Sequence, residues 1–217
     1  NLYIDDADKN RIIEKPIYPA RGLIKLQNGK IIAENIVTKD LFIQKKLIES
    51  SKEQLNFLEK VVLVNREIIL TALEEYKSED KFLLLSSLNN QETAKFELNK
   101  DSMPNIKLET TLKRYLPQKN LFSHVIGHLG RLTVEEKKFL PRFEYPSSSF
   151  LGKVGIEKFY EEELKGLPGV SFIEVDVHGN RVREINRDLP SKPENITLTL
   201  DLELQKIAQA ELGNRKG

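Results

Sequence analysis

The sequence contains no cysteine, and this absence excludes several kinds of chemistry. Without thiols there is no cysteine nucleophile, no disulfide and no zinc site that needs thiolate ligands. An excess of charge of one sign is missing too, because 34 Lys and Arg stand against 33 Asp and Glu. Basic and acidic residues are interleaved, so the chain offers no broad basic field to nucleic acid. We therefore expect no nucleic-acid partner.

Long hydrophobic runs are also absent. No segment approaches the roughly 20 apolar residues of a membrane span, and the N-terminus lacks a basic start followed by an apolar stretch. The chain has 217 residues, of which 39% are hydrophobic and 31% charged, so it can bury a core. Because it begins with Asn1 and ends in a turn-like sequence, we interpret it as an excised piece of a longer protein.

Strand-type patterns occupy the N-terminal part. Between residues 11 and 35, Asn28-Gly29 separates two runs rich in β-branched residues, and this dipeptide favours the tight turn of a hairpin. Residues 106–112 alternate again and predict another strand.

Similar patterns return near the C-terminus. Residues 170–177 and 180–185 flank His178-Gly179, which predicts a second hairpin. Residues 196–200 predict a last strand, after which Asp201 is the candidate N-cap of a helix through Leu212.

Helical periodicity dominates the middle of the chain. Apolar residues recur at three, four or seven positions between residues 40 and 76, and residues 91–98 follow with Asn89 as a candidate N-cap. We therefore predict a helical insertion over residues 40–105. Three shorter helices are expected. One covers residues 121–129, a second follows the capping-box sequence that begins at Thr133, and a third covers residues 156–164. The sum is an α+β protein with strands at both ends and helices between them.

Few residues suggest catalysis. His124 and His128 are four apart, as in helical metal sites, but Val125 stands where a zinc protease needs Glu, and a structural role for both is favoured. The sequence Ser78-Glu-Asp-Lys81 matches an acyl-serine motif by letters only, since it lies in a charged loop without the accompanying motifs. We expect no catalytic residue, no metal and no cofactor.

Two other patterns have plain structural explanations. Residues 152–155 have glycines before a helix but lack the rest of a phosphate-binding loop, so a turn that packs the helix closely is favoured. Glu161, Glu162 and Glu163 are expected to form a solvated face, and the sequon at Asn195 is discounted.

Four segments in order resemble class B penicillin-binding proteins. They are Arg21-Gly22-Leu23-Ile24 with Asn28-Gly29-Lys30-Ile31-Ile32-Ala33; Tyr115-Leu116-Pro117 with His124-Val125-Ile126-Gly127-His128-Leu129-Gly130-Arg131; residues 152–169; and Leu198-Thr199-Leu200-Asp201 with Leu202-Glu203-Leu204-Gln205. The long spacer between Arg131 and Gly152 is similar to the cell-elongation branch, the penicillin-binding protein 2 type.

The resemblance implies a non-catalytic pedestal, also called the dimerisation domain, on the periplasmic side of the inner membrane. An anchor sheet built from both ends of the segment would carry a helical head. The expected parts are residues 1–39 (anchor), 40–105 (head), 106–195 (return, with a linker near 141–150) and 196–217 (junction to a transpeptidase domain). The implied partners are a membrane-embedded glycan polymerase and a scaffold protein of the MreC type, with membrane attachment through a preceding helix.

The motif residues are expected to serve structure or an interface. Arg21 and Glu157 are predicted to form an ion pair. The full set is Arg21, Gly22, Asn28, Gly29, His124, Gly127, Gly130, Arg131, Gly152, Gly155, Glu157, Gly179 and Asp201. Two alternatives stay open: a freestanding periplasmic interaction or chaperone module, and a small hydrolase that uses His124, His128 or Ser78.

Overall fold

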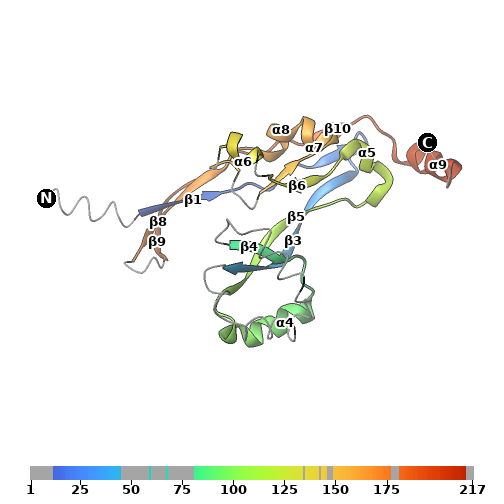
Figure 1. The fold of residues 1–217 in the computed structure, drawn as a ribbon. Coiled ribbons are helices and arrows are strands. Elements are labelled where there is room, and N and C mark those ends of the chain that lie inside the picture. Colours follow the sequence, from blue (N-terminus) through green and yellow to red (C-terminus); the bar gives the residue numbers. More distant parts are fainter. Residues whose placement is uncertain are drawn as a thin grey trace. The chain divides into compact units, whose positions relative to one another are not determined.

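The computed structural model describes residues 12–44, 59, 67, 81–133, 135–141, 143–145, 149–176 and 181–213. Within these ranges the protein is α+β, as predicted, with short helices and three sheets (Figure 1). The chain divides into two compact units, Asn1–Asn35 with Arg114–Gly217, and Ile36–Lys113. No helix in the described part of the chain is long and apolar enough to cross a bilayer.

One sheet of the first unit joins the two ends of the chain. Strand β1 (Ile12–Ile17) pairs antiparallel with β8 (Gly169–Val175), which pairs antiparallel with β9 (Arg181–Asp188) (Figure 1). The β8–β9 pair confirms the predicted second hairpin, although the turn at 177–180 lies outside the described residues.

A second sheet also brings the ends together. Strand β2 (Ile24–Leu26) pairs in parallel with β10 (Ile196–Leu198) and antiparallel with the start of β3 (Ile31–Gln44). The β2–β3 hairpin is confirmed: the Gly29 amide donates to the Leu26 carbonyl at 2.9 Å, and Gly29 has φ +81°. An anchor sheet formed from both ends of the chain is therefore present.

Short helices and a small sheet complete the first unit. The elements are η3 (Lys119–Phe122), α5 (Ser123–Ile126), β6 (Leu129–Arg131), α6 (Glu136–Phe139), β7 (Phe150–Gly152), α7 (Gly155–Phe159), α8 (Glu161–Lys165) and α9 (Leu202–Leu212). The prediction of one helix over 121–129 is wrong at its end, because Gly127 adopts φ +80° and Leu129 begins a strand. The predicted helix over 156–164 is two helices, which meet at the non-helical Tyr160 (φ −106°, ψ 35°).

The core of the first unit lies between the β2–β3 hairpin and these helices. Buried side chains from β2 and β3 pack with Phe122 and Ile126 near α5, with Leu164 of α8 and with Leu202 of α9. Burial of such side chains contributes about 1.5–3 kcal/mol each relative to exposure. Distant segments are thus held together mainly by apolar packing.

The second unit contains strands that the sequence did not predict. Strand β3 continues to Gln44, and β4 (Lys81–Leu85) pairs with it, so a wholly helical insertion over 40–105 is wrong. The physical reason is tertiary, since Asp40 is buried and accepts hydrogen bonds from Ser87 and Thr111.

Other predictions for the second unit are confirmed. Helix α4 (Asn90–Asn99) is capped by Asn89 and followed by η2 (Lys100–Ser102), and β5 (Ile106–Tyr115) pairs with β3. The predicted stripe over residues 55–76 lies outside the described residues, apart from Glu59 and Glu67, which are helical.

A buried ion-pair network as the candidate functional site

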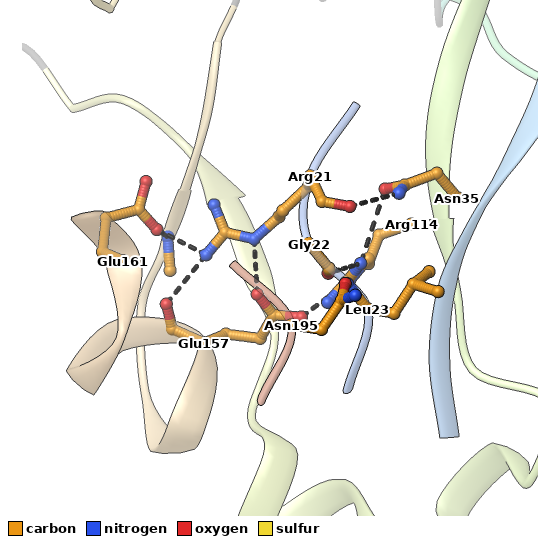
Figure 2. Close-up of polar contacts among 9 residues, drawn as sticks. Arg21, Gly22, Leu23, Asn35, Arg114, Glu157, Glu161 and Asn195 are labelled. Atoms are coloured by element: carbon orange, nitrogen blue, oxygen red, sulfur yellow. Dashed lines mark hydrogen bonds and ion pairs between the residues drawn. The ribbon is translucent and has the colours of Figure 1, made fainter. Parts of the chain in front are cut away.

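Arg21 precedes β2 and points toward α7 and α8 (Figure 2). Its Nε donates to Glu157 Oε2 at 2.6 Å, and its Nη2 donates to Glu161 Oε2 at 2.6 Å and to the Glu157 carbonyl at 2.9 Å. The predicted ion pair between Arg21 and Glu157 is therefore confirmed. These bonds join the N-terminal segment to helices that lie more than 130 positions later.

A second arginine binds the same carboxylate. Arg114, near the end of β5, donates from Nε to Glu157 Oε1 at 2.7 Å and from Nη1 to the Gly22 carbonyl at 2.8 Å. The Glu157 side chain is 1% exposed, and each of its carboxylate oxygens accepts from one guanidinium, Oε2 from Arg21 and Oε1 from Arg114. Charge-assisted hydrogen bonds of this kind are short and strong, and they hold three chain segments at fixed distances.

The two arginines experience different electrostatic environments. Burial by itself would lower the pKa of Arg21, but the hydrogen bond to Glu161 and the charges of Glu157 and Glu161 outweigh it, so the pKa is raised. Burial lowers the pKa of Arg114, and Glu157 offsets this only partly. Arg21 has two carboxylate partners and Arg114 has one. Both guanidiniums stay charged at physiological pH.

Glu161 corrects a prediction from the sequence. The carboxylates of residues 161–163 were expected to form a solvated face, but only Glu162 and Glu163 are exposed. Glu161 is buried, binds Arg21 and accepts a hydrogen bond from the Gly152 amide at 3.0 Å. A buried carboxylate needs such partners because desolvation otherwise disfavours its charged form.

Asparagine side chains bind the backbone around the network (Figure 2). Asn35 Nδ2 donates to the Arg21 carbonyl at 2.5 Å. Asn195 Oδ1 accepts from the Leu23 amide at 2.7 Å, so the discounted sequon has a structural role beside the β2–β10 pair.

Glycine is required where backbones approach each other closely. A Cβ on Gly22 would lie 1.8 Å from the Glu194 carbonyl oxygen, and a Cβ on Gly152 would lie 2.0 Å from that of Glu157. The segment before α7 is therefore a turn that packs the helix closely, as the sequence favoured, and the Gly152 amide is already used by Glu161.

The remaining motif residues do not gather into a reactive site. His124 is exposed in α5, and His128 is exposed beyond its end, so the two do not share a helix face. Among the described residues, no three His, Asp or Glu side chains are placed to hold a metal. The other predicted residues lie in turns, short strands, caps or the first position of α7, namely Asn28, Gly29, Gly127, Gly130, Arg131, Gly155 and Asp201. Gly179 and Ser78 lie outside the described residues.

Sequence reasoning missed Arg114, Glu161, Asn35 and Asn195 as members of the network. Glu161 had a usable signal, since it lies four positions after Glu157 within the resembling segment. The only signal for Arg114 in the sequence was its position directly before the Tyr115-Leu116-Pro117 segment. The two asparagines carry no local signal, because their partners are backbone groups of β2 and its approach.

Comparison with known proteins identifies the family of the chain. Residues 16–198 match the penicillin-binding protein dimerisation domain. The peptidoglycan D,D-transpeptidase MrdA of Acinetobacter baumannii is 32% identical over 97% of this chain and 32% of that protein. MrdA of Escherichia coli K12 is 27% identical over 99% of this chain and 35% of that protein. The chain thus spans about a third of the length of these curated relatives.

Solved structures share the fold. The penicillin-binding protein PBP2 of Helicobacter pylori in complex with MreC matches with a TM-score of 0.79 and 24% identity over 95% of this chain and 39% of that chain. A second structure of the penicillin-binding protein PBP2 of Helicobacter pylori matches with a TM-score of 0.64 and 24% identity over 94% of this chain and 40% of that chain. From the family match over residues 16–198 and the identity to MrdA over nearly the whole sequence, the chain belongs to the penicillin-binding protein dimerisation domain family.

Proposed function

We propose that this chain is the non-catalytic pedestal of a peptidoglycan D,D-transpeptidase of the elongation type. The observation that carries the proposal is the alignment of 97% of the chain with 32% of MrdA, a D,D-transpeptidase. In the whole protein, a membrane helix precedes the pedestal and a serine-type, penicillin-binding transpeptidase domain follows it. The pedestal then lies on the periplasmic side of the inner membrane.

The first compact unit is the anchor in this proposal, and the second unit is the head. The anchor suits the task because strands from both ends of the chain pair in it and the Arg21–Glu157–Arg114 network binds their connections. A rigid base of this kind transmits position from a membrane helix to a catalytic domain, whereas a flexible linker would not.

The proposed partners are a scaffold protein of the MreC type and a membrane-embedded glycan polymerase. The likeness to a PBP2 that forms a complex with MreC supports the first partner. The polymerase is proposed from the resemblance of the sequence motifs to the elongation branch. A partner that binds one orientation of the head more tightly shifts the population toward that orientation, and this gives the pedestal a means of regulation.

The test is labelling with a fluorescent penicillin. We expect no labelling of this chain and labelling of a longer product of the same gene that includes the transpeptidase domain. Labelling of the 217-residue chain would refute the non-catalytic role and would make Ser78 the first residue to replace. Failure of the longer product to be labelled would refute the transpeptidase assignment.

The partner is tested separately by titrating this chain with the periplasmic part of the MreC-type protein from the same genome. Saturable binding supports the proposed contact. If neither this chain nor the longer product binds, the MreC-type partner is refuted while the pedestal role stands.

A further inference from the structure

The sheet formed by β1, β8 and β9 in the first unit brings two basic residues to either side of a serine (Figure 1). Residues directly opposite one another in neighbouring strands place their side chains on the same face of a sheet. Ser171 in the central strand β8 lies opposite Lys15 of β1 and opposite Arg187 of β9. These three residues therefore form a row across one face, which we call the basic row.

Strand β9 brings further charge to this face. Alternate residues of β8 share a face with Ser171, and Arg181 and Glu184 lie opposite two of them because the register shifts twice. Glu184 forms ion pairs with Arg181 at 2.9 Å and with Arg187 at 3.0 Å. One carboxylate thus serves two guanidiniums, and Lys15 makes no ion pair with any residue that the structure describes. Positive charge is therefore in excess on this face.

The opposite face of the same sheet is acidic. The even-numbered residues of β8 point to it, and Glu14 and Asp188 lie opposite two of them. A third carboxylate, that of Glu174, lies opposite Arg183 and forms an ion pair with it at 2.6 Å. Three carboxylates thus share this face with one guanidinium. The two faces of the sheet suit ligands of opposite charge.

The Ser171 hydroxyl is a second, independent sign of a ligand at the basic row. Ser171 is 4% exposed, and its Oγ is buried without a hydrogen-bond partner in the described part of the chain. A buried polar group without a partner costs free energy, so such groups are rare and need an explanation. Lys15 and Arg187, which flank this hydroxyl, are exposed. Rotation of their long side chains can admit an anion that accepts hydrogen bonds from all three residues.

We propose that the basic row binds the phosphate group of an anionic phospholipid. Phosphate oxygens accept strong charge-assisted hydrogen bonds from guanidinium and ammonium groups, and a further oxygen accepts from the serine hydroxyl. Ile13 lies on the same face, opposite Ile173, and is 46% exposed. An apolar side chain thus adjoins the charges, and surfaces that bind at a bilayer interface combine these two features.

The choice of a lipid as the source of the phosphate rests on the proposed function. There a membrane helix precedes β1, the first strand that the structure describes, so this sheet follows the bilayer directly along the chain. The phosphate chemistry itself rests on the register of the sheet and on the Ser171 hydroxyl.

Flotation with lipid vesicles gives the first test. We expect the chain to bind vesicles of phosphatidylcholine that contain about 30% phosphatidylglycerol and not to bind vesicles of phosphatidylcholine alone. Arg187→Ala should weaken binding about fivefold, because a basic side chain near an anionic surface contributes about 1 kcal/mol. Absence of binding to the anionic vesicles would overturn the proposal.

Arg183→Ala is the matched control. Arg183 lies in the same strand as Arg187, is exposed and also forms an ion pair with a glutamate, but it points to the acidic face. We expect this control to weaken binding by less than about twofold. Equal losses for the two variants would mean that only the total charge matters, and the basic row would be refuted. Thermal melts establish that each variant folds.

Titration with inorganic phosphate at constant ionic strength separates the site from its lipid source. In nuclear magnetic resonance spectra we expect the amides of Lys15, Ser171 and Arg187 to shift. Ser171→Ala should weaken phosphate binding about fivefold without lowering the melting temperature, because the hydroxyl has no partner among the described residues. If these amides do not shift, the phosphate site is refuted.

The two experiments together distinguish the possible outcomes. If inorganic phosphate shifts the amides of the basic row but the anionic vesicles do not bind, the lipid is the wrong ligand and the proposal is overturned. Neither experiment depends on penicillin labelling or on MreC binding, so its failure leaves the proposed function intact.

Discussion

Replacement of Glu157 by glutamine should strongly destabilise the anchor. The substitution preserves the size of a side chain that is 1% exposed but removes its charge. Arg114 would then lose the carboxylate that its Nε contacts at 2.7 Å, whereas Arg21 would keep Glu161 at 2.6 Å. The amide NH₂ group would also face a guanidinium where a carboxylate oxygen had accepted a hydrogen bond.

The expected cost follows from the burial of the two arginines. Their side chains are 10% and 9% exposed, so a lost partner leaves positive charge that water cannot solvate. Removal of one member of such a buried pair costs about 3–5 kcal/mol. The total stability of a domain is about 5–15 kcal/mol, so this is a large fraction of it. At roughly 2–4 °C for each kcal/mol, the melting temperature should fall by roughly 6–20 °C.

Thermal and urea denaturation measure this loss directly. Glu162→Gln is the matched control, because it makes the same chemical change at the second residue of α8, where the side chain is exposed. The control should stay within about 0.5 kcal/mol of the unmodified chain. If Glu157→Gln is equally mild, the network does not stabilise the anchor and the reasoning is refuted.

Three further predictions concern caps, turns and pH. Asp201→Ala should cost about 1 kcal/mol in urea denaturation, because Asp201 accepts from two amides at the start of α9; Asp201→Asn should cost less, and equal effects would contradict capping. Gly127→Ala should destabilise more than Gly29→Ala, since both have φ near +80° but only at Gly127 would the Cβ meet a carbonyl oxygen, at 1.9 Å; similar melting temperatures would refute this reasoning. The hydrogen bond from Lys153 lowers the pKa of Glu136 in the folded protein. This interaction therefore stabilises the fold above the ordinary carboxyl pKa of 4.5, and its contribution is lost as the pH falls through the lowered folded-state pKa. Glu136→Gln should therefore lower the melting temperature at neutral pH, and the difference should shrink in acid; a pH-independent difference would contradict it.

Local signals predicted several elements correctly. Asn28-Gly29 specified a hairpin because the turn needs a backbone conformation that glycine allows. Asn89 and Asp201 marked the starts of α4 and α9 because their side chains accept hydrogen bonds from amides two or three residues later. These interactions involve neighbours in the sequence, so no knowledge of the fold is needed to anticipate them.

The family resemblance also predicted that strands from the two ends of the chain pair in one sheet. It also brought Arg21 and Glu157 together, although 136 positions separate them. Strand β4 and the second half of β3 were not anticipated, because Asp40 and the residues around it carry a helix-like pattern while their partners lie on β4, β5 and the loop after β4.

The sequence by itself determined the α+β class, the turns and caps, and the family to which the motifs belong. The tertiary structure alone decided which glutamate of residues 161–163 is buried and which arginine shares Glu157 with Arg21. The physical reason is that a charged side chain is stable in the interior only where partners from other segments meet it. Such partners are set by the packing of the whole unit, and their spacing along the chain does not reveal them.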